Sequence, residues 1–227
     1  EYTITRRPRV RKRLHMELDP GGGLLVVAPE HWSGRQISSI LAHNRSRVLR
    51  FVNRARERRL EPLQYVDGER HLYLGNRFML KILPVSDPKT TVIINADELC
   101  IETRVASQQN VQAALQLWYR RQALIVFGER LQHVSQKADW VRHQSISLKL
   151  RKMKRTWGNC SAAGVIKLNV HLVKAPVRII DSVIAHELCH LKELNHSNAF
   201  YSLLEGLNPD WRRDRATLKS KGHEYLL

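Results

Sequence analysis

The sequence predicts an α+β protein with an N-terminal β-rich region that contains a helix, a long connecting helix and a C-terminal metal-binding domain. Short apolar segments separated by turn residues fill the first hundred positions, whereas helical periodicity dominates from about residue 107. We expect a sheet-rich region over residues 1–103 and a second domain over residues 104–227. The boundary is soft, because no repeat, low-complexity tract or Pro-rich linker marks it.

The N-terminal region is expected to open with a hairpin. Residues 14–18 alternate apolar and polar side chains, residues 19–23 read Asp-Pro-Gly-Gly-Gly, and the apolar run 24–28 follows. Residues 35–59 then carry apolar side chains at helical spacing, and Ser33 is the predicted N-cap of that helix. The pattern therefore indicates strands combined with one amphipathic helix.

The middle of the chain predicts more sheet and then the long helix. Between Leu63 and Thr103, short strands alternate with turn sequences that contain Gly, Asp and Pro. Ser107 precedes a helical stretch that extends to about Lys137 and carries a long apolar stripe. We expect this helix to link the two halves of the molecule.

Composition limits the class of protein. The chain has 227 residues, of which 43% are hydrophobic and 26% charged, as in ordinary globular proteins, so disorder is excluded as the main state. No apolar run approaches the ~20 residues of a membrane span, and the first residues do not resemble a signal peptide. Three scattered cysteines do not form a paired framework, so we expect a cytoplasmic protein that is not integral to a membrane.

The chain is strongly basic. Lys and Arg number 38 against 21 Asp and Glu, which gives a formal net charge of +17 and favours anionic partners such as nucleic acid bound without sequence preference. The predicted helix over residues 35–59 carries the candidate nucleic-acid contacts, which are Arg45, Arg47, Arg50, Arg54 and Arg56. The alternative is that these arginines form only a solvated face that keeps the protein soluble.

Three histidines and a glutamate form the most informative pattern. His186 and His190 lie four residues apart in a predicted amphipathic helix, so both imidazoles share one face and can bind a single Zn²⁺. Glu187 can reach a water on that metal without being a ligand itself. Cys189 points away from the shared face and is expected to be an inert buried thiol. Incidental histidines are the alternative interpretation.

His196 is the leading candidate for a third ligand. An unbroken helix would carry it about 9 Å beyond His190 and onto another face, so the helix must end first. Asn195 tolerates the left-handed conformation that closes a helix, and Ser197 can cap a following helix. The pattern predicts one metal ion per chain, zinc or another divalent ion, with one coordination position left open.

Residues 154–209 also carry a family resemblance. The segments R-T-W-G-N-C-S, I-K-L-N-V-H-L, H-E-L-C-H-L-K-E-L-N-H-S and N-P-D-W resemble the YgjP-like metallopeptidases, which are similar to SprT-like and other zincin proteases. Asn159 stands where the usual W-G-S-C motif has a serine, a change that affects only hydrogen bonding at this position, and it is a candidate contact to substrate or transition state. The resemblance implies a zincin-like metallopeptidase domain with zinc ligands at His186, His190 and His196, and with Glu187 as general base.

The preferred function is zinc-dependent hydrolysis of peptide bonds in a peptide or unfolded protein. Residues 165–172 are the predicted edge strand for an extended substrate. Residues 151–155 would rim the cleft with basic side chains. Tyr201 and Arg155 are candidate transition-state donors, and Trp157 either contacts substrate or plugs the core.

Two other functions are compatible with the sequence. A metal-activated water can also attack phosphorus, which allows a nucleotide phosphohydrolase such as a nucleoside triphosphate pyrophosphatase, although no glycine-rich phosphate loop is present. A basic nucleic-acid-binding module with a structural metal is the third possibility. Three histidines without a paired cysteine ligand favour an open, catalytic site over a structural one. A peptidase that acts on nucleic-acid-associated proteins would combine peptide hydrolysis with nucleic-acid binding. The sequence leaves the oligomeric state open.

Overall fold

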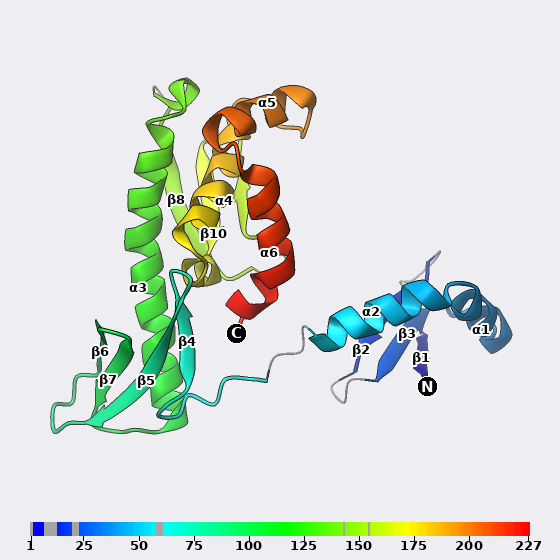
Figure 1. Cartoon of the computed structure of the whole chain (residues 1–227), viewed down its shortest axis with the longest axis horizontal. Helices are drawn as coiled ribbons and strands as arrows, with labels where there is room; N and C mark the ends of the chain where they lie inside the picture. Colours follow the sequence, from blue (N-terminus) through cyan, green and yellow to red (C-terminus); the bar gives the residue numbers. More distant parts are fainter. Residues whose placement is uncertain (1, 7–12, 20–22, 58–60, 143, 154) are drawn as a thin grey trace. The chain divides into compact units, whose positions relative to one another are not determined.

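The computed structural model describes residues 2–6, 13–19, 23–57, 61–142, 144–153 and 155–227 (Figure 1). It divides into two compact units, Glu1–Glu61 and Pro62–Leu227. The division therefore lies well before the boundary predicted near residue 104. The physical reason is that Leu80, Leu99 and Ile101, which belong to the predicted N-terminal sheet region, share one hydrophobic core with the long helix. The α+β class itself is confirmed.

The first unit pairs a three-stranded sheet with two helices. Its elements are β1 (Tyr2–Arg6), β2 (His15–Leu18), β3 (Leu24–Ala28), α1 (Gly34–His43) and α2 (Arg45–Glu57). The predicted hairpin is confirmed, because β2 lies antiparallel to β3, while β1 pairs with the other edge of β3 in parallel. Its core is formed by Leu24, Val26, Ala28, Ile37 and Leu41.

The predicted helix over residues 35–59 is two helices. Ser33 caps α1 as predicted, with Gln36 completing a capping box. Asn44 ends that helix, since both its backbone N–H and its side-chain amide donate to the carbonyl of Ile40. An asparagine side chain that binds the backbone competes with helix propagation, and a second helix begins at Arg45.

The second unit begins with a mixed sheet that packs on a long helix. The sheet has the order β4-β5-β7-β6, with β4 (Arg70–Tyr73), β5 (Asn76–Pro84), β6 (Thr91–Asn95) and β7 (Glu98–Thr103). Helix α3 (Gln108–Ser135) follows where the long helix is predicted, and the Ser107 side chain caps it. No helix in the described part of the chain is both long and apolar enough to cross a bilayer.

The rest of the second unit surrounds the candidate metal ligands. A short 3₁₀ helix, η1 (Asp139–Val141), leads to β8 (Ser147–Arg151), β9 (Gly158–Cys160), β10 (Val165–Asn169), the 3₁₀ helix η2 (Val170–Lys174), α4 (Val177–Cys189), α5 (Asn198–Leu207) and α6 (Trp211–Tyr225). Its sheet has the order β8-β10-β9. Figure 1 shows α4 between α3 and α6, and α4 contacts both helices.

The tip of the β4–β5 hairpin is fastened to the segment that starts α4. The backbone N–H groups of Leu74 and Gly75 donate to the carbonyls of Val173 and Lys174, both at 3.0 Å. Gly75 has φ +84°, and a Cβ there would lie 2.7 Å from Cγ of Pro176. Only glycine combines this backbone conformation with so close an approach. The hairpin therefore fixes where α4 begins.

Candidate metal centre

Helix α4 and the turn after it bring the three histidines together. His186 lies in the last turn of α4, His190 is its C-cap residue, and His196 lies one residue before Ser197, which caps α5. Buried Ile180 and Ile184, on sides of α4 that face away from the ligands, hold the helix in the core. Packing thus holds α4 in place, and the four-residue spacing of His186 and His190 places their imidazoles on the same side of it.

The break that returns His196 to the site differs from the predicted one. Helix α4 ends at Cys189 rather than near Asn195. Tight backbone bonds, from Leu191 to Leu188 and from Lys192 and Glu193 to Cys189, form the turn. Asn195 is not among the described residues with positive φ. The prediction that the helix breaks before His196 is confirmed, but the left-handed asparagine is wrong because the helix ends earlier.

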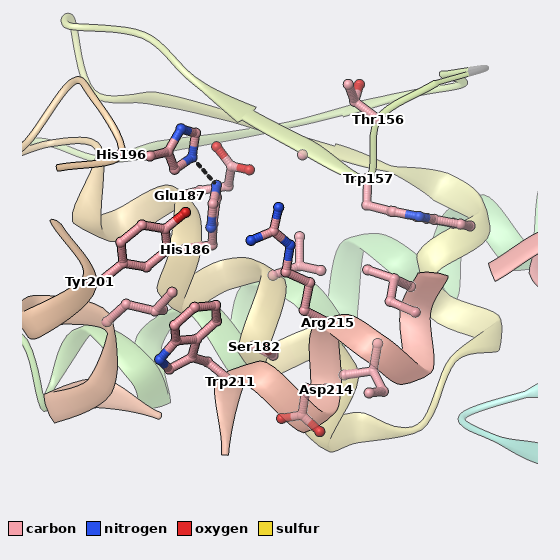
Figure 2. Close-up of a pocket in the computed structure, with 15 residues that line it drawn as sticks. Thr156, Trp157, Ser182, His186, Glu187, His196, Tyr201, Trp211, Asp214 and Arg215 are labelled. Atoms are coloured by element: carbon pink, nitrogen blue, oxygen red, sulfur yellow. Dashed lines mark hydrogen bonds between the residues drawn. The ribbon is translucent and has the colours of Figure 1, made fainter. Parts of the chain in front are cut away.

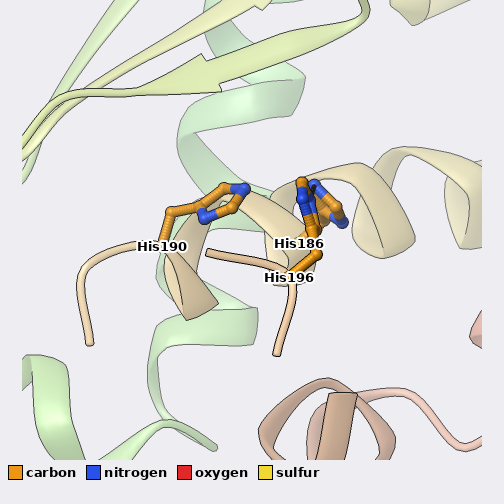
Figure 3. Close-up of side chains that lie close together, drawn as sticks. All are labelled: His186, His190 and His196. Carbon is orange, nitrogen blue, oxygen red and sulfur yellow. Dashed lines mark hydrogen bonds between the residues drawn. The ribbon is translucent and has the colours of Figure 1, made fainter. Parts of the chain in front are cut away.

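The three imidazoles face a common space (Figure 3). One ring nitrogen from each of His186, His190 and His196 can be chosen so that all lie within 4.8 Å of one another. Nε2 of His186 and Nε2 of His196 are 3.1 Å apart, close to the ~3.3 Å between two nitrogens that bind one tetrahedral zinc ion at about 2.0 to 2.1 Å. The donor set and spacing fit zinc.

Hydrogen bonding and burial prepare these rings as neutral ligands. Nδ1 of His190 lies 3.0 Å from the carbonyl oxygen of Glu193, which can only accept, so Nδ1 carries the proton and Nε2 keeps its lone pair. Burial lowers the pKa of His186 most, and together with the neighbouring groups His190, His196 and Arg215 it brings this pKa to about 4. Burial, and then His190 and Arg215, also lower the pKa of His196.

Glu187 lies beside the ligands in a confined position. It is only 5% exposed, and burial raises its pKa to about 7. A carboxyl group with a pKa near neutrality can both take up and release a proton at physiological pH. A Cβ at Gly158 would lie 2.6 Å from Oε1 of Glu187, so the backbone of β9 passes directly over the carboxylate. The glycine leaves the room that Glu187 needs.

A cavity of about 320 Å³ opens beside His186 and Glu187 (Figure 2). Its walls are mostly apolar and include Ile179, Val183, Leu204, Trp211 and Leu218. Arg215, from α6, is the only Lys or Arg among the described residues that line it. Figure 2 shows its guanidinium turned toward the side of the cavity where His186 and Glu187 lie. The cavity can therefore hold a large apolar group next to one cation.

Arg215 is the functional candidate that the sequence reasoning missed. Within the described part of the chain, its guanidinium makes no hydrogen bond or ion pair, whereas nearby Arg178 pairs with Asp214. It lies 28 residues after Glu187 in a run of charged residues, so no motif separates it from Arg212 and Arg213. The available signal was its helical spacing from Trp211, four residues earlier, which places both side chains on one face of the helix.

The other predicted contacts divide into two groups. Tyr201 and Trp157 line the cavity. The Tyr201 ring lies 6.2 Å from the ring of His196, and Trp157 also packs against Tyr225 at 6.1 Å. Arg155 and Asn159 are exposed and are not among the lining residues.

None of the described residues in the basic segment 151–155 lines the cavity beside the metal ligands, so they do not form the expected rim. Lys152 lines a different cavity and donates to the side-chain oxygen of Gln116. Lys154 lies outside the described residues.

The predicted substrate strand is wrong. Val165–Asn169 forms β10, which is paired in parallel with β8 on one side and antiparallel with β9 on the other, and residues 170–174 are the 3₁₀ helix η2. A central strand has no free backbone edge. The edge strand that contacts α4 is β9. Sheet order depends on long-range pairing, which local patterning does not reveal.

Convergent imidazoles beside a buried carboxylate are typical of metallohydrolases. The chain belongs to the YgjP-like metallopeptidase family, whose metallopeptidase-domain model matches residues 12–221. Among solved structures, it is similar to the metallopeptidase zymogen abylysin of Pyrococcus abyssi, with 22% identity and a TM-score of 0.37 over 41% of this chain and 93% of that one. No curated protein matches the chain.

Proposed function

We propose that this protein is a zinc-dependent peptidase that uses His186, His190 and His196 as ligands and Glu187 as general base. The observation that carries the proposal is the convergence of three imidazoles beside one buried carboxylate. Membership of a metallopeptidase family supports the same chemistry. The proposed metal is zinc because three neutral nitrogens in this spacing suit its tetrahedral preference.

The side chains of this site would divide the reaction among them. Bound zinc would supply a Lewis acid that polarises the scissile carbonyl and lowers the pKa of the attacking water. Glu187 accepts a proton from that water at its carboxylate and returns it to the leaving amine. Arg215 donates to the substrate carbonyl oxygen as negative charge develops there, and Tyr201 is a second candidate donor.

Substrate would bind as an extended chain along β9. An edge strand offers backbone hydrogen bonds that do not depend on sequence. The apolar cavity beside Glu187 would take one large apolar side chain of the substrate. These features support unfolded polypeptides as substrates, with a preference for bulky apolar residues next to the cleaved bond.

Product analysis tests the proposal. Zinc-loaded protein is incubated with unfolded casein and, separately, with each nucleoside triphosphate, and the products are identified by mass spectrometry. We expect new peptide termini that enrich apolar residues on one side of the cut, and none after chelation. Phosphate or pyrophosphate release that requires Glu187, without new peptide termini, would instead establish the nucleotide phosphohydrolase and overturn the proposal.

Nucleic-acid binding by the first unit is a separate proposal. Arg45, Arg47 and Arg50 of α2 are exposed, which supports contact with phosphates. The side chains of Arg54 and Arg56 lie outside the described residues. Titration of labelled DNA at two salt concentrations tests it, since phosphate contacts weaken steeply as salt rises. Affinity that ignores salt would leave the arginines as a solvated face. The three free cysteines support a reducing compartment such as the cytoplasm.

A further inference from the structure

A second cavity, of about 190 Å³, lies in the Pro62–Leu227 unit and shares no lining residue with the metal pocket. Two lysines and two histidines line it: Lys152, Lys174, His71 and His171. No Asp or Glu appears among its lining residues in the described part of the chain. The cavity therefore concentrates basic groups without the acidic partners that normally accompany buried lysines.

Lys174 is the central group. It is 6% exposed, and its Nζ donates to the backbone oxygen of Leu227 and lies 4.6 Å above the ring of Tyr119. Neither partner is the side chain of an Asp or Glu, and an ammonium group has three protons to donate, of which the oxygen of Leu227 takes one. Burial and, to a smaller extent, the charge of Lys152 together lower the pKa of Lys174 to about 8. A buried ammonium with spare donors and a repelling neighbour gains from a bound anion.

The nearest acidic side chain does not supply that anion. Glu69, the acid beside His71, already accepts from the backbone N–H groups of Gln64 and Tyr65 at 2.6 and 2.8 Å and lies 2.9 Å from His71 Nε2. The Glu69 carboxylate is therefore occupied by these three partners and makes no hydrogen bond to Lys174 among the described contacts. Burial lowers the pKa of His171 to about 4, so it is neutral at physiological pH and adds a polar nitrogen rather than a charge.

We propose that this cavity binds a small organic carboxylate with a short apolar group, held by Lys174 and Lys152. The contact already present shows the chemistry, because Leu227 presents an oxygen to Lys174 while Leu226 and Leu227 form part of the wall. Leu63, Leu115 and Val170 extend the apolar surface. The volume suits a group of a few carbon atoms and is too small for a nucleotide. The proposal does not depend on peptidase activity.

Calorimetric titration of the full chain with 4-methylpentanoate tests this site. This probe joins a carboxylate to a leucine-like apolar group. We expect saturable 1:1 binding near pH 7 and a dissociation constant that rises about tenfold or more in Lys174→Met, because a hydrogen-bonded charge contact is lost. Lys152→Met, at an exposed position of the cavity mouth, should raise it several-fold without affecting folding.

Matched probes and a matched variant make the result decisive. Neutral 4-methylpentanamide tests the need for charge, and inorganic phosphate tests the need for the apolar group; each should bind at least about tenfold more weakly. Lys149→Met, which removes an exposed lysine outside the cavity, should bind 4-methylpentanoate as the wild type does. Absence of binding by the wild type, equal affinity for the amide or phosphate, or unchanged affinity in both cavity-lysine variants would overturn the proposal.

Discussion

The metal pocket and the second cavity, called the lysine-lined cavity because Lys152 and Lys174 line it, both gather basic nitrogens, yet they suit ligands of opposite charge. In the metal pocket, His186, His190 and His196 direct ring nitrogens toward one point. Neutral imidazole nitrogens carry lone pairs, so that point attracts a cation. In the other cavity, Lys174 can offer only protons, so it attracts an anion. The comparison shows that the protonation state, rather than the residue class, decides what a basic cluster binds.

Two histidines make the contrast within one residue type. Burial lowers the pKa of both His186 and His171 to about 4. His186 has two other imidazoles within reach, whereas His171 faces Lys152 and Lys174, which also lower its pKa. Desolvation alone therefore does not make a metal ligand. The neighbouring groups decide whether a neutral histidine has a partner ion.

The largest expected effect is on catalysis in the metal pocket. Glu187→Gln should lower peptide hydrolysis by about 10² to 10⁴-fold, because an amide cannot accept a proton from water. Zinc content should remain stoichiometric, since glutamine fills the same space and the three histidines are untouched. Casein cleavage together with elemental analysis of the same sample measures both. Retained turnover would remove Glu187 from its assigned role, and loss of zinc would make it a ligand.

A paired substitution tests the contrast between the two histidines. His196→Ala should weaken zinc binding by more than about 100-fold, because even groups that only orient a ligand contribute 10 to 100-fold. His171→Ala should leave zinc affinity unchanged. Competition with a chromophoric chelator gives both affinities. If the two variants behave alike, the three-histidine centre is not the binding site.

Arg215 places a positive charge in the same pocket that is proposed to bind the zinc ion. Arg215→Ala should lower kcat/KM by about 10²-fold, the usual effect of removing one donor to a developing oxyanion, and Arg215→Lys should recover part of it. Zinc affinity should not fall, since removing a positive charge from the vicinity cannot weaken cation binding. Arg213→Ala, on the same helix but outside the cavity, is the control. Equal kinetics for Arg213→Ala and Arg215→Ala would contradict the assignment.

The smallest effect concerns stability around the lysine-lined cavity. Because the pKa of Lys174 is about 8 in the folded state and near its ordinary 10.5 in the unfolded state, the unfolded state binds more protons between these values, and stability rises with pH there. Relative to Lys174→Met, the wild type should gain about 2 kcal/mol in unfolding free energy from pH 7.5 to 9.5. Urea denaturation at both pH values measures this difference. Parallel pH profiles would show that Lys174 is not desolvated.

Local chemistry made much of this molecule predictable. The caps at Ser33 and Ser197 lie where the sequence predicts them, because a cap depends on a hydroxyl and the next three residues. Helical spacing likewise predicts that His186 and His190 approach each other, and the structure places them together with His196.

Features that depend on distant packing were not predictable. The central position of β10, the entry of Arg215 into the metal pocket and the burial of Lys174 arise from contacts between segments far apart in the chain. The split at Asn44 was also missed, because apolar periodicity continues across it while one side-chain hydrogen bond ends the helix.

The contact between the β4–β5 hairpin and the segment that starts α4 makes the metal site sensitive to substitutions far from it. A Cβ at Gly75 would clash with Pro176, which lies ten residues, or about 15 Å of helix, before His186. Because an α-helix is stiff, a shift of its first turn is transmitted to its last turn. A bulkier residue at the hairpin tip would therefore displace the imidazoles without contacting them. Variation that damages this centre is therefore expected in a segment that an inspection of the pocket alone would pass over.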